Sequence, residues 1–177
     1  PWCESFEEYA SNGYPQDWYR YNQAGSNNPC TYRFYTRTGD RCLQFYINRT
    51  TSPTAYAILP DLDIDDIRHT TVHLFMSVSN YGSCRLVVGV MENPEDISTF
   101  VPVDTLANGY QTGNNSYKGH SINMQRYNGE GRFIAFCAFM QSSSSGYIYL
   151  DDLIITADPQ PVATLIAPTS VRFDIDT

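Results

Sequence analysis

Two adjacent carboxylates, Asp151 and Asp152, stand inside an otherwise apolar segment. Side chains of a strand alternate between its two faces, so one of the pair points inward unless the strand twists at a bulge. A buried carboxylate is costly unless it has a cation or several hydrogen-bond donors beside it. Carboxylates and backbone carbonyls suit a hard cation, so the pair forms a candidate Ca²⁺ site. Backbone N–H groups or an arginine are the alternative partners.

Glu7, which follows the apolar Phe6, is a similarly placed acid near the start of the chain. The common catalytic motifs are missing from the sequence: it has no Gly-x-Ser-x-Gly elbow, no His-Glu-x-x-His, no P-loop and no dinucleotide fingerprint. The Glu-x-Asp-x-x-Glu signature of β-sandwich glucanases is missing too. The sequence therefore predicts a protein that is not an enzyme.

The negative net charge limits the kinds of partner that the chain can bind. The net charge is −8 and the isoelectric point is about 4.6, so phosphate backbones and anionic lipids are repelled. No apolar run approaches the ~20 residues that a membrane-spanning helix needs. We therefore expect no nucleic-acid partner and no membrane insertion, whereas cations and neutral glycans remain possible.

Aromatic residues make up 14% of the chain and supply the candidate ligand-binding residues. A tyrosine or tryptophan ring offers a large contact area at a small entropic cost, which suits sugar stacking and protein contacts. The candidates are Trp18, Tyr19 and Tyr21 in the first long loop, and Tyr110 and Tyr117 near a later loop. The alternative is that such rings pack in the core, since strands favour aromatics, and this applies above all to Trp18.

Short alternating runs between Gly, Pro, Asn and Ser clusters predict an all-β fold. The expected strands are Thr31–Thr36, Cys42–Asn48, Thr54–Leu59, Thr71–Ser79, Cys84–Met91, Phe100–Thr105, Tyr117–Met124, Arg132–Phe139 and Gly146–Thr156. The expected loops are Ser11–Pro29, Gly109–Ser116 and Ser142–Ser145. Strands that are numerous, short and evenly spaced are typical of a β-sandwich or barrel.

The chain divides into a main domain, residues 1–157, and a C-terminal piece, residues 158–177. Two prolines break the strand pattern at the start of that piece, which we interpret as a linker and the start of a following module, or as an extra edge strand. The chain begins with Pro1 and shows no charged-then-apolar leader, so we expect a part excised from a longer precursor. Of five cysteines, Cys30 and Cys42 could staple a hairpin, although pairing cannot be deduced from sequence.

An ordered set of motifs identifies a family resemblance over about Cys3 to Thr156. The motifs are the Cys3–Glu7 start, the following Gly13 and Trp18, the stretches Val88–Thr105 and Gly129–Phe136, and the closing Ile148–Leu153. Together they resemble the MAM-like and cleaved-adhesin (choice-of-anchor J) jelly rolls of large bacterial surface proteins. The resemblance implies a two-sheet antiparallel β-sandwich of jelly-roll topology, whose first and last strands are neighbours.

The resemblance also implies a structural Ca²⁺ that joins those two strands. Carried over, its ligands are Glu7 and Asp151 or Asp152, with Glu4 as a weaker candidate. This chain departs from the pattern, because it has only Asp17 where calcium-binding adhesin modules place an Asp-rich run.

The function that the resemblance implies is that of a non-catalytic adhesion or carbohydrate-recognition module in a secreted, multidomain protein of the bacterial cell surface. The expected partners are a glycan or a host or cell-surface protein, together with other domains of the same polypeptide. The alternative is a structural spacer or protein-binding domain that presents neighbouring modules. A glycan module needs exposed rings beside polar groups, whereas a spacer has flat, charged faces.

Overall fold

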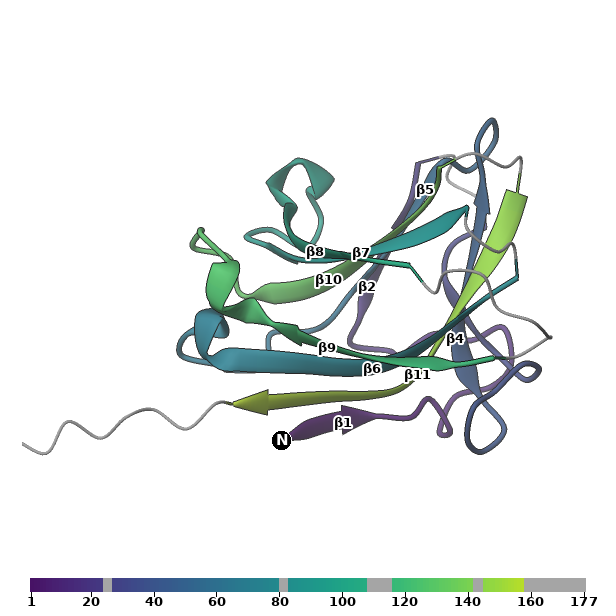
Figure 1. Cartoon of the computed structure of the whole chain (residues 1–177), viewed down its shortest axis with the longest axis horizontal. Helices are drawn as coiled ribbons and strands as arrows, with labels where there is room; N and C mark the ends of the chain where they lie inside the picture. Colours follow the sequence, from purple (N-terminus) through teal and green to yellow (C-terminus); the bar gives the residue numbers. More distant parts are fainter. Residues whose placement is uncertain (24–26, 80–82, 108–115, 142–144, 158–177) are drawn as a thin grey trace, which may run out of the picture.

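The computed structural model describes residues 1–23, 27–79, 83–107, 116–141 and 145–157. These residues form two antiparallel sheets that face each other as an upper and a lower layer (Figure 1). The first sheet runs β3 (Cys30–Tyr32), β4 (Cys42–Asn48), β11 (Ser145–Ala157), β6 (Thr70–Val78) and β9 (Lys118–Asn123), with β1 (Trp2–Glu4) also paired to β11. The second runs β2 (Tyr19–Asn22), β5 (Thr54–Ile58), β10 (Phe133–Met140), β7 (Cys84–Met91) and β8 (Val101–Leu106). The predicted two-sheet antiparallel sandwich is confirmed.

Single 3-10 turns complete the described structure: η1 (Ile67–His69), η2 (Ile97–Thr99) and η3 (Met124–Arg126). No helix in the described residues is long and apolar enough to span a membrane.

The core lies between the sheets and follows strand alternation. In β4, Leu43, Phe45 and Ile47 point inward and are fully buried, while the residues between them face outward. In β10, Phe136 is also fully buried, and this strand lies between β5 and β7 in the middle of its sheet. Each such side chain contributes about 1.5–3 kcal/mol to folding by leaving water. The other face of β10 is apolar because a second, smaller cluster covers it, in which Ala135 packs with Ile58 and Met91.

The predicted strands agree closely with the observed ones, and β4 and β7 coincide with their predictions. Three local expectations were wrong. The run Thr31–Thr36 is a strand only to Tyr32, the expected loop Ser11–Pro29 contains β2, and β1 is not among the strands that the alternating runs predicted. The expected strand breaks off because Tyr35 adopts a left-handed φ of 63°, which turns the chain away from the sheet.

Three sequence assignments fall largely on residues that the structure does not describe. The loop Gly109–Ser116 is described only at Ser116, and the loop Ser142–Ser145 only at Ser145. The C-terminal piece, residues 158–177, lies entirely outside the described residues, so its assignment as linker, module or edge strand stays a prediction.

All five cysteines are free thiols. Cys30 lies opposite Gln44, and Cys42 lies opposite Tyr32 across the β3–β4 pair. The expected staple between Cys30 and Cys42 is therefore not formed.

The first and last described strands are neighbours, as the resemblance implied. Trp2 pairs with Ile155, and Glu4 pairs with Leu153. Figure 1 shows the N-terminus beside the end of β11 at the lower edge of the molecule. This pairing brings the acidic residues of both strands to one corner of the sandwich.

Candidate functional site

The two adjacent carboxylates lie at a bulge in β11. The pairing of β11 with β6 shifts register between Asp151 and Ile154, and Asp152 has a left-handed φ of 47°. A bulge re-aims side chains that would otherwise alternate between the two faces. Both carboxylates therefore contact the same loop, at Arg37 and Thr38. A bulge at this pair of residues was the stated alternative to strict strand alternation.

Asp151 is fully buried and is held by backbone donors. Its Oδ2 accepts the N–H of Arg37 at 2.8 Å and that of Thr38 at 3.2 Å, and its Oδ1 accepts the N–H of Asp152 at 2.8 Å. Burial raises the pKa of Asp151 to about 6, although the amides of Arg37 and Thr38 favour the charged form and oppose that rise. The side chain is thus a fixed anchor for the loop rather than a free acid.

Asp152 holds the same loop through side chains. It pairs with the guanidinium of Arg37, and its Oδ1 accepts the hydroxyl of Thr38 at 2.7 Å. The Arg37 guanidinium also lies over the ring of Phe75, 3.5 Å from its centroid. A cation over an aromatic ring is attracted by the negative face of the ring. Arg37 therefore ties the loop to both β11 and β6.

Glu7 holds the other half of the loop. Its two carboxylate oxygens accept the N–H groups of Asp40 at 2.8 Å and Arg41 at 3.0 Å. Gly39, between these donors and Thr38, has a φ of +57°, and a Cβ there would lie 2.4 Å from the Glu7 carboxyl carbon. We call Glu7, Asp151 and Asp152 the carboxylate clamp, because together they fix residues 37–41.

Glu4 is engaged locally and does not join the clamp. It accepts the N–H of Phe6 at 2.6 Å and the hydroxyl of Tyr9 at 3.1 Å. Burial and the nearby Glu4 raise the pKa of Tyr9 to about 12, so the hydroxyl stays protonated as a donor. Phe6 itself has a left-handed φ of 64° and is fully buried, with its ring edge-on to Trp18 at 5.8 Å.

The acidic residues that the resemblance assigned to calcium do not fit a calcium site in the described part of the chain. No three metal-ligating side chains gather there, and the carboxylate oxygens of Glu4, Glu7 and Asp151 accept backbone N–H groups and, at Glu4, also the Tyr9 hydroxyl. A cation needs carboxylate lone pairs that face it together. The arrangement is that of the alternative partners, amides and an arginine, and metal binding stays a prediction that chelation tests.

Of the predicted ligand-binding residues, Trp18 lies in the core. Only 8% of its surface is exposed, and its ring contacts Trp2, Phe6 and Tyr14 with centroids 5.8 to 6.3 Å apart. Trp18 therefore offers little surface to a ligand. This is the core packing stated as its alternative.

Tyr19 and Tyr21 lie side by side on β2, an edge strand of the second sheet, and are 39% and 37% exposed. Each ring is supported edge-on by a ring of the same sheet: Tyr19 by Phe133 of β10 at 6.1 Å, and Tyr21 by Tyr56 of the adjacent β5 at 6.0 Å. Phe100 continues the row at 5.5 Å from Tyr56. We call these five residues the β2 face.

Tyr117 is separate from the β2 face. Its hydroxyl donates to the carbonyl of Tyr35 at 2.6 Å, so it supports the loop that the clamp holds. Burial beside Cys42 and Asp151 raises the pKa of Tyr117, which keeps this hydroxyl protonated. Tyr110 lies outside the described residues.

A second group of rings was missed by sequence reasoning. It covers the outer side of β3, β4 and β11, and we call it the tyrosine face: Tyr32, Phe34, Tyr35, Tyr46, Tyr147 and Tyr149. Tyr147 and Tyr149 stand at alternate positions of one predicted strand, which marks them as facing the same way. The sequence contains this alternation, but it does not reveal the register of β4 and β11 that sets Tyr147 opposite Tyr46.

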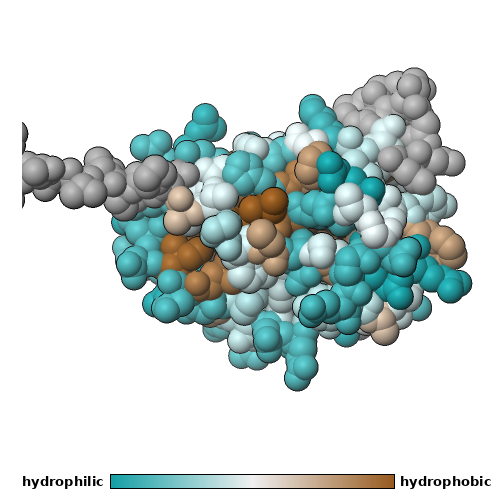
Figure 2. All heavy atoms as spheres, turned by 90° about the horizontal axis from the view of Figure 1, so that it is seen from below, coloured by the Kyte–Doolittle hydropathy of each residue, from teal (hydrophilic) through white to brown (hydrophobic). Residues whose placement is uncertain are grey.

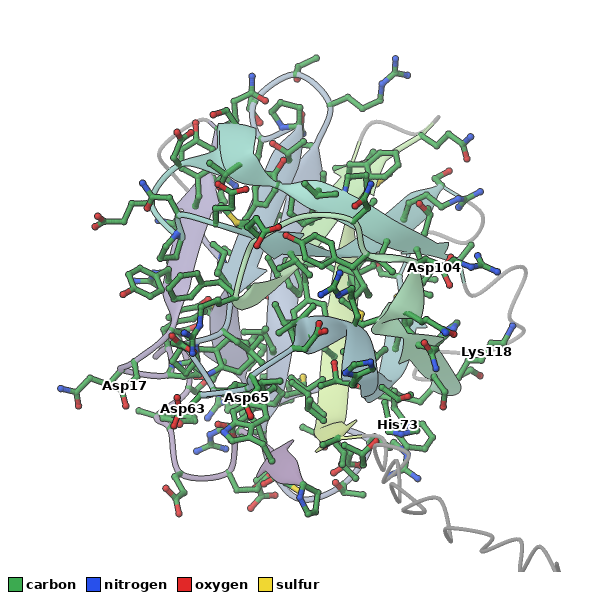
Figure 3. All side chains as sticks on the ribbon, turned by 90° about the vertical axis from the view of Figure 1, so that its left-hand side faces the viewer. Asp17, Asp63, Asp65, His73, Asp104 and Lys118 are labelled. Carbon is green, nitrogen blue, oxygen red and sulfur yellow. The ribbon has the colours of Figure 1, made fainter. Side chains whose placement is uncertain are left out.

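Two hollows lie away from both aromatic faces. One lies between β8 and β9 and is lined by Val103, Asp104, Ser121, Asn123 and Arg126. Figure 3 shows Asp104 and Lys118 near this edge, and Asp63 and Asp65 on the opposite side of that view, where the second hollow lies.

Ion pairs lie in and beside the second hollow, whose lining also includes the acids Asp65 and Glu130. Arg68 pairs with Asp66 at 2.8 Å, and Arg132 pairs with Asp61 at 3.1 Å and Asp63 at 3.6 Å. The pairing with Arg68 lowers the pKa of Asp66 to about 2, so this carboxylate is charged and not a proton donor at neutral pH.

Several solved structures have the same fold as this chain. The K3 cleaved adhesin domain of Lys-gingipain from Porphyromonas gingivalis superposes with a TM-score of 0.64 at 20% identity, over 88% of this chain and 97% of that one. The K1 domain from the same bacterium gives a TM-score of 0.62 at 18% identity, over 89% and 98%. This chain has the fold of the cleaved adhesin domains.

The cleaved-adhesin fold is shared with sugar-binding modules. The CBM22-1 xylan-binding domain of Paenibacillus barcinonensis Xyn10C superposes with a TM-score of 0.53 at 15% identity, over 88% of this chain and 92% of that one. At these identities the likeness concerns the fold alone. No known family and no curated protein sequence matches the chain.

Proposed function

We propose that this chain is a non-catalytic glycan-recognition and adhesion module, and that Tyr19 and Tyr21 of the β2 face form its sugar platform. The observation that carries the proposal is the pair of exposed rings on one edge strand, each braced by a second ring. Braced rings lose little conformational freedom when a ligand packs on them. The fold shared with adhesin and xylan-binding domains supports the proposal as an analogy.

The acidic residues support a binding role rather than catalysis. A glycosidase uses two opposed carboxyl groups that are free to donate and accept protons. Here Glu7 and Asp151 accept backbone N–H groups, and Asp66 is paired with Arg68. The carboxylates of the clamp serve to hold the chain, which is a structural task.

The alternative of a spacer has weaker support. A spacer that separates two modules needs its ends far apart, whereas Trp2 pairs with Ile155 near the end of β11. A spacer also needs no exposed rings, and this molecule exposes aromatic rings on both of its outer sheet faces. By the same analogy, we propose that the module belongs to a secreted, multidomain protein of the bacterial surface, where its partner is a surface glycan or glycoprotein.

A glycan array probed with the wild-type domain and with the Tyr19→Ala/Tyr21→Ala variant tests the proposal. We expect the wild type to bind a set of neutral glycans, and the variant to bind them at least about tenfold more weakly. Tenfold is about 1.4 kcal/mol, which is comparable with the loss of aromatic contacts. Gln125→Ala, an exposed change on η3 away from both aromatic faces, is the control.

Two results would contradict the proposal. If the wild type is silent across the array, the spacer or protein-binding reading replaces it. If the wild type binds and the Tyr19→Ala/Tyr21→Ala variant binds equally well, the β2 face is not the platform.

A further inference from the structure

The tyrosine face differs from a scattered set of surface tyrosines because its rings touch. Tyr147 and Tyr149 stack with planes 10° apart and centroids at 6.1 Å. Tyr46 lies 5.1 Å from Tyr147, and Tyr35 lies 5.2 Å from Tyr149. Rings in mutual contact hold one another in place, so the face is preorganised for a ligand.

The face has a floor and a wall. Strands β4 and β11 supply the floor through Tyr46, Tyr147 and Tyr149, whose side chains point away from the core. The wall consists of Phe34 and Tyr35, from the loop that precedes β4. Three of the rings are open to solvent: Phe34 is 50%, Tyr35 42% and Tyr147 36% exposed. Tyr149 is only 5% exposed, so it supports the rings of Tyr35 and Tyr147 and offers little surface itself.

The wall is fixed rather than free to collapse onto the floor. The carboxylate clamp fixes residues 37–41 directly after it. The hydroxyl of Tyr117 holds the carbonyl of Tyr35 at 2.6 Å. The angle between floor and wall is therefore set by hydrogen bonds that do not involve the exposed rings themselves.

The chemistry of the floor selects the kind of ligand. The outward side chains of β3, of β4 and of residues 145–149 carry no charge, although the whole chain has a net charge of −8. These positions hold tyrosines, cysteines, a serine and the amides Gln44 and Asn48. The wall adds one charged group, the Arg33 guanidinium, which lies 4.8 Å from the centroid of the Phe34 ring. Gln44 hydrogen-bonds Tyr149, and the tyrosine hydroxyls add further donors and acceptors. Rings beside uncharged polar groups match the apolar faces and hydroxyls of a neutral sugar.

We infer that the tyrosine face is a second binding site, for a neutral oligosaccharide, on the opposite outer face of the sandwich from the β2 face. The inference shares its ligand class with the proposed function, but it depends on different residues. A module with two such faces binds a polymeric glycan or a glycan-covered surface with an avidity that neither face has alone.

The test is affinity electrophoresis in gels that contain xylan, mannan, galactan or β-glucan, with polygalacturonate as the charged probe. The Phe34→Ala/Tyr147→Ala variant removes one ring of the wall and one of the floor. We expect it to bind at least one neutral polysaccharide at least about tenfold more weakly than wild type, since two aromatic contacts are lost. The Tyr19→Ala/Tyr21→Ala variant should keep that interaction, and a variant with all four changes should lose all retardation.

Ile154→Ala is the matched control. Ile154 is a large exposed side chain, 37% accessible, on β11 beyond the bulge and outside both aromatic faces. Figure 2 shows several small hydrophobic groups among hydrophilic residues on the side of the molecule where β1, β11 and β6 lie. A loss of binding in this control equal to that of Phe34→Ala/Tyr147→Ala would overturn the inference, because any exposed apolar group would then suffice.

The outcomes separate the two sites. If Phe34→Ala/Tyr147→Ala binds every neutral polysaccharide as wild type does while Tyr19→Ala/Tyr21→Ala does not, the second site is wrong and the proposed function stands. Retardation of the wild type by polygalacturonate alone, or by none of the gels, also overturns the second site. If the double variant does not fold, Phe34→Ala alone removes a half-exposed loop ring and gives the same readout.

Discussion

The two aromatic faces of this sandwich are built in different ways. Every ring of the β2 face except Phe100 comes from a strand, and each exposed tyrosine is braced by a ring of another strand in the same sheet. The tyrosine face combines strand residues with Phe34 and Tyr35 from a loop. That loop is held by carboxylates from the two ends of the described domain, Glu7 and Asp151.

The two faces are held in place by different interactions. The β2 face depends on the packing of its own sheet, so only local changes should weaken it. The tyrosine face depends on hydrogen bonds between residues more than 100 positions apart, as between Arg37 and Asp151. A change at the clamp should therefore separate the two faces, which makes the clamp the best place to test the comparison.

The largest expected effect is that of Asp151→Ala. It removes the acceptor of three part-buried hydrogen bonds, from the N–H groups of Arg37, Thr38 and Asp152, and each such bond to a charged group contributes about 1.5 kcal/mol. We expect the free energy of unfolding in urea to fall by about 4 kcal/mol. Glycan binding by the tyrosine face should weaken, while binding by the β2 face should persist in the fraction that stays folded.

Asp63→Asn is the control for this prediction, since it removes only the long, exposed pair with Arg132 and asparagine tolerates the left-handed φ of 54° at this position. Exposed pairs of this kind contribute ~1 kcal/mol or less. Equal losses of both faces in Asp151→Ala would show that the clamp supports the whole fold and not one face.

Much of the fold could be predicted from the sequence because sandwich strands alternate. The runs Cys42–Asn48 and Cys84–Met91 have apolar residues at every second position, and both are observed as predicted. Short edge strands lack this signal. Tyr19–Asn22 has three exposed residues out of four, so nothing in its pattern separates β2 from a loop.

The candidate site was harder to predict, because its geometry depends on pairing. The acid pair Asp151–Asp152 was correctly placed beside the N-terminal Phe-Glu segment, but not its partners. Those partners are backbone amides of residues 37–41, which any residue type can supply. A carboxylate that binds such amides and one that binds calcium look alike in sequence, and only the fold distinguishes them.

The second prediction concerns pH and the same carboxyl group. The pKa of Asp151 is raised from 3.8 to about 6, so its stabilising contribution is complete below about pH 3.8 and is lost as pH rises through about 6. A shift of this size corresponds to at most about 3 kcal/mol. The free energy of unfolding, measured in urea from pH 7 to pH 4, should therefore contain a component that rises on acidification.

The Asp151→Asn variant isolates that component. His120 acts in the opposite direction, because burial lowers its pKa and its contribution is lost as pH falls below its unfolded value of 6.5. We expect the difference in unfolding free energy between wild type and Asp151→Asn to shift in favour of wild type from pH 7 to pH 4. A constant difference would show that the amide hydrogen bonds fully offset the cost of burial.

A smaller effect is expected for Phe133→Ala, which weakens the β2 face and leaves the tyrosine face intact. Phe133 braces Tyr19 edge-on at 6.1 Å and is only partly buried. Loss of such an aromatic pair costs about 1 kcal/mol beyond the area exposed. Binding by the β2 face should weaken several-fold while the tyrosine face is unaffected, as measured with the Phe34→Ala/Tyr147→Ala variant in the same gels. Unchanged binding would mean that Tyr19 needs no brace.

The smallest effect is expected from chelation, which tests whether the carboxylate clamp contains a bound cation. Glu7 and Asp151 accept backbone N–H groups at 2.8 to 3.2 Å, so the clamp needs no cation to neutralise it. We expect the melting temperature in excess EDTA to equal that in added Ca²⁺. A protein stabilised by a bound ion gains RT ln(1 + [L]/Kd), which would appear as a higher melting temperature with Ca²⁺.

A fall of several degrees in EDTA that Ca²⁺ reverses in wild type but not in Asp151→Asn would make these carboxylates metal ligands. The tyrosine face would then depend on calcium and the β2 face would not.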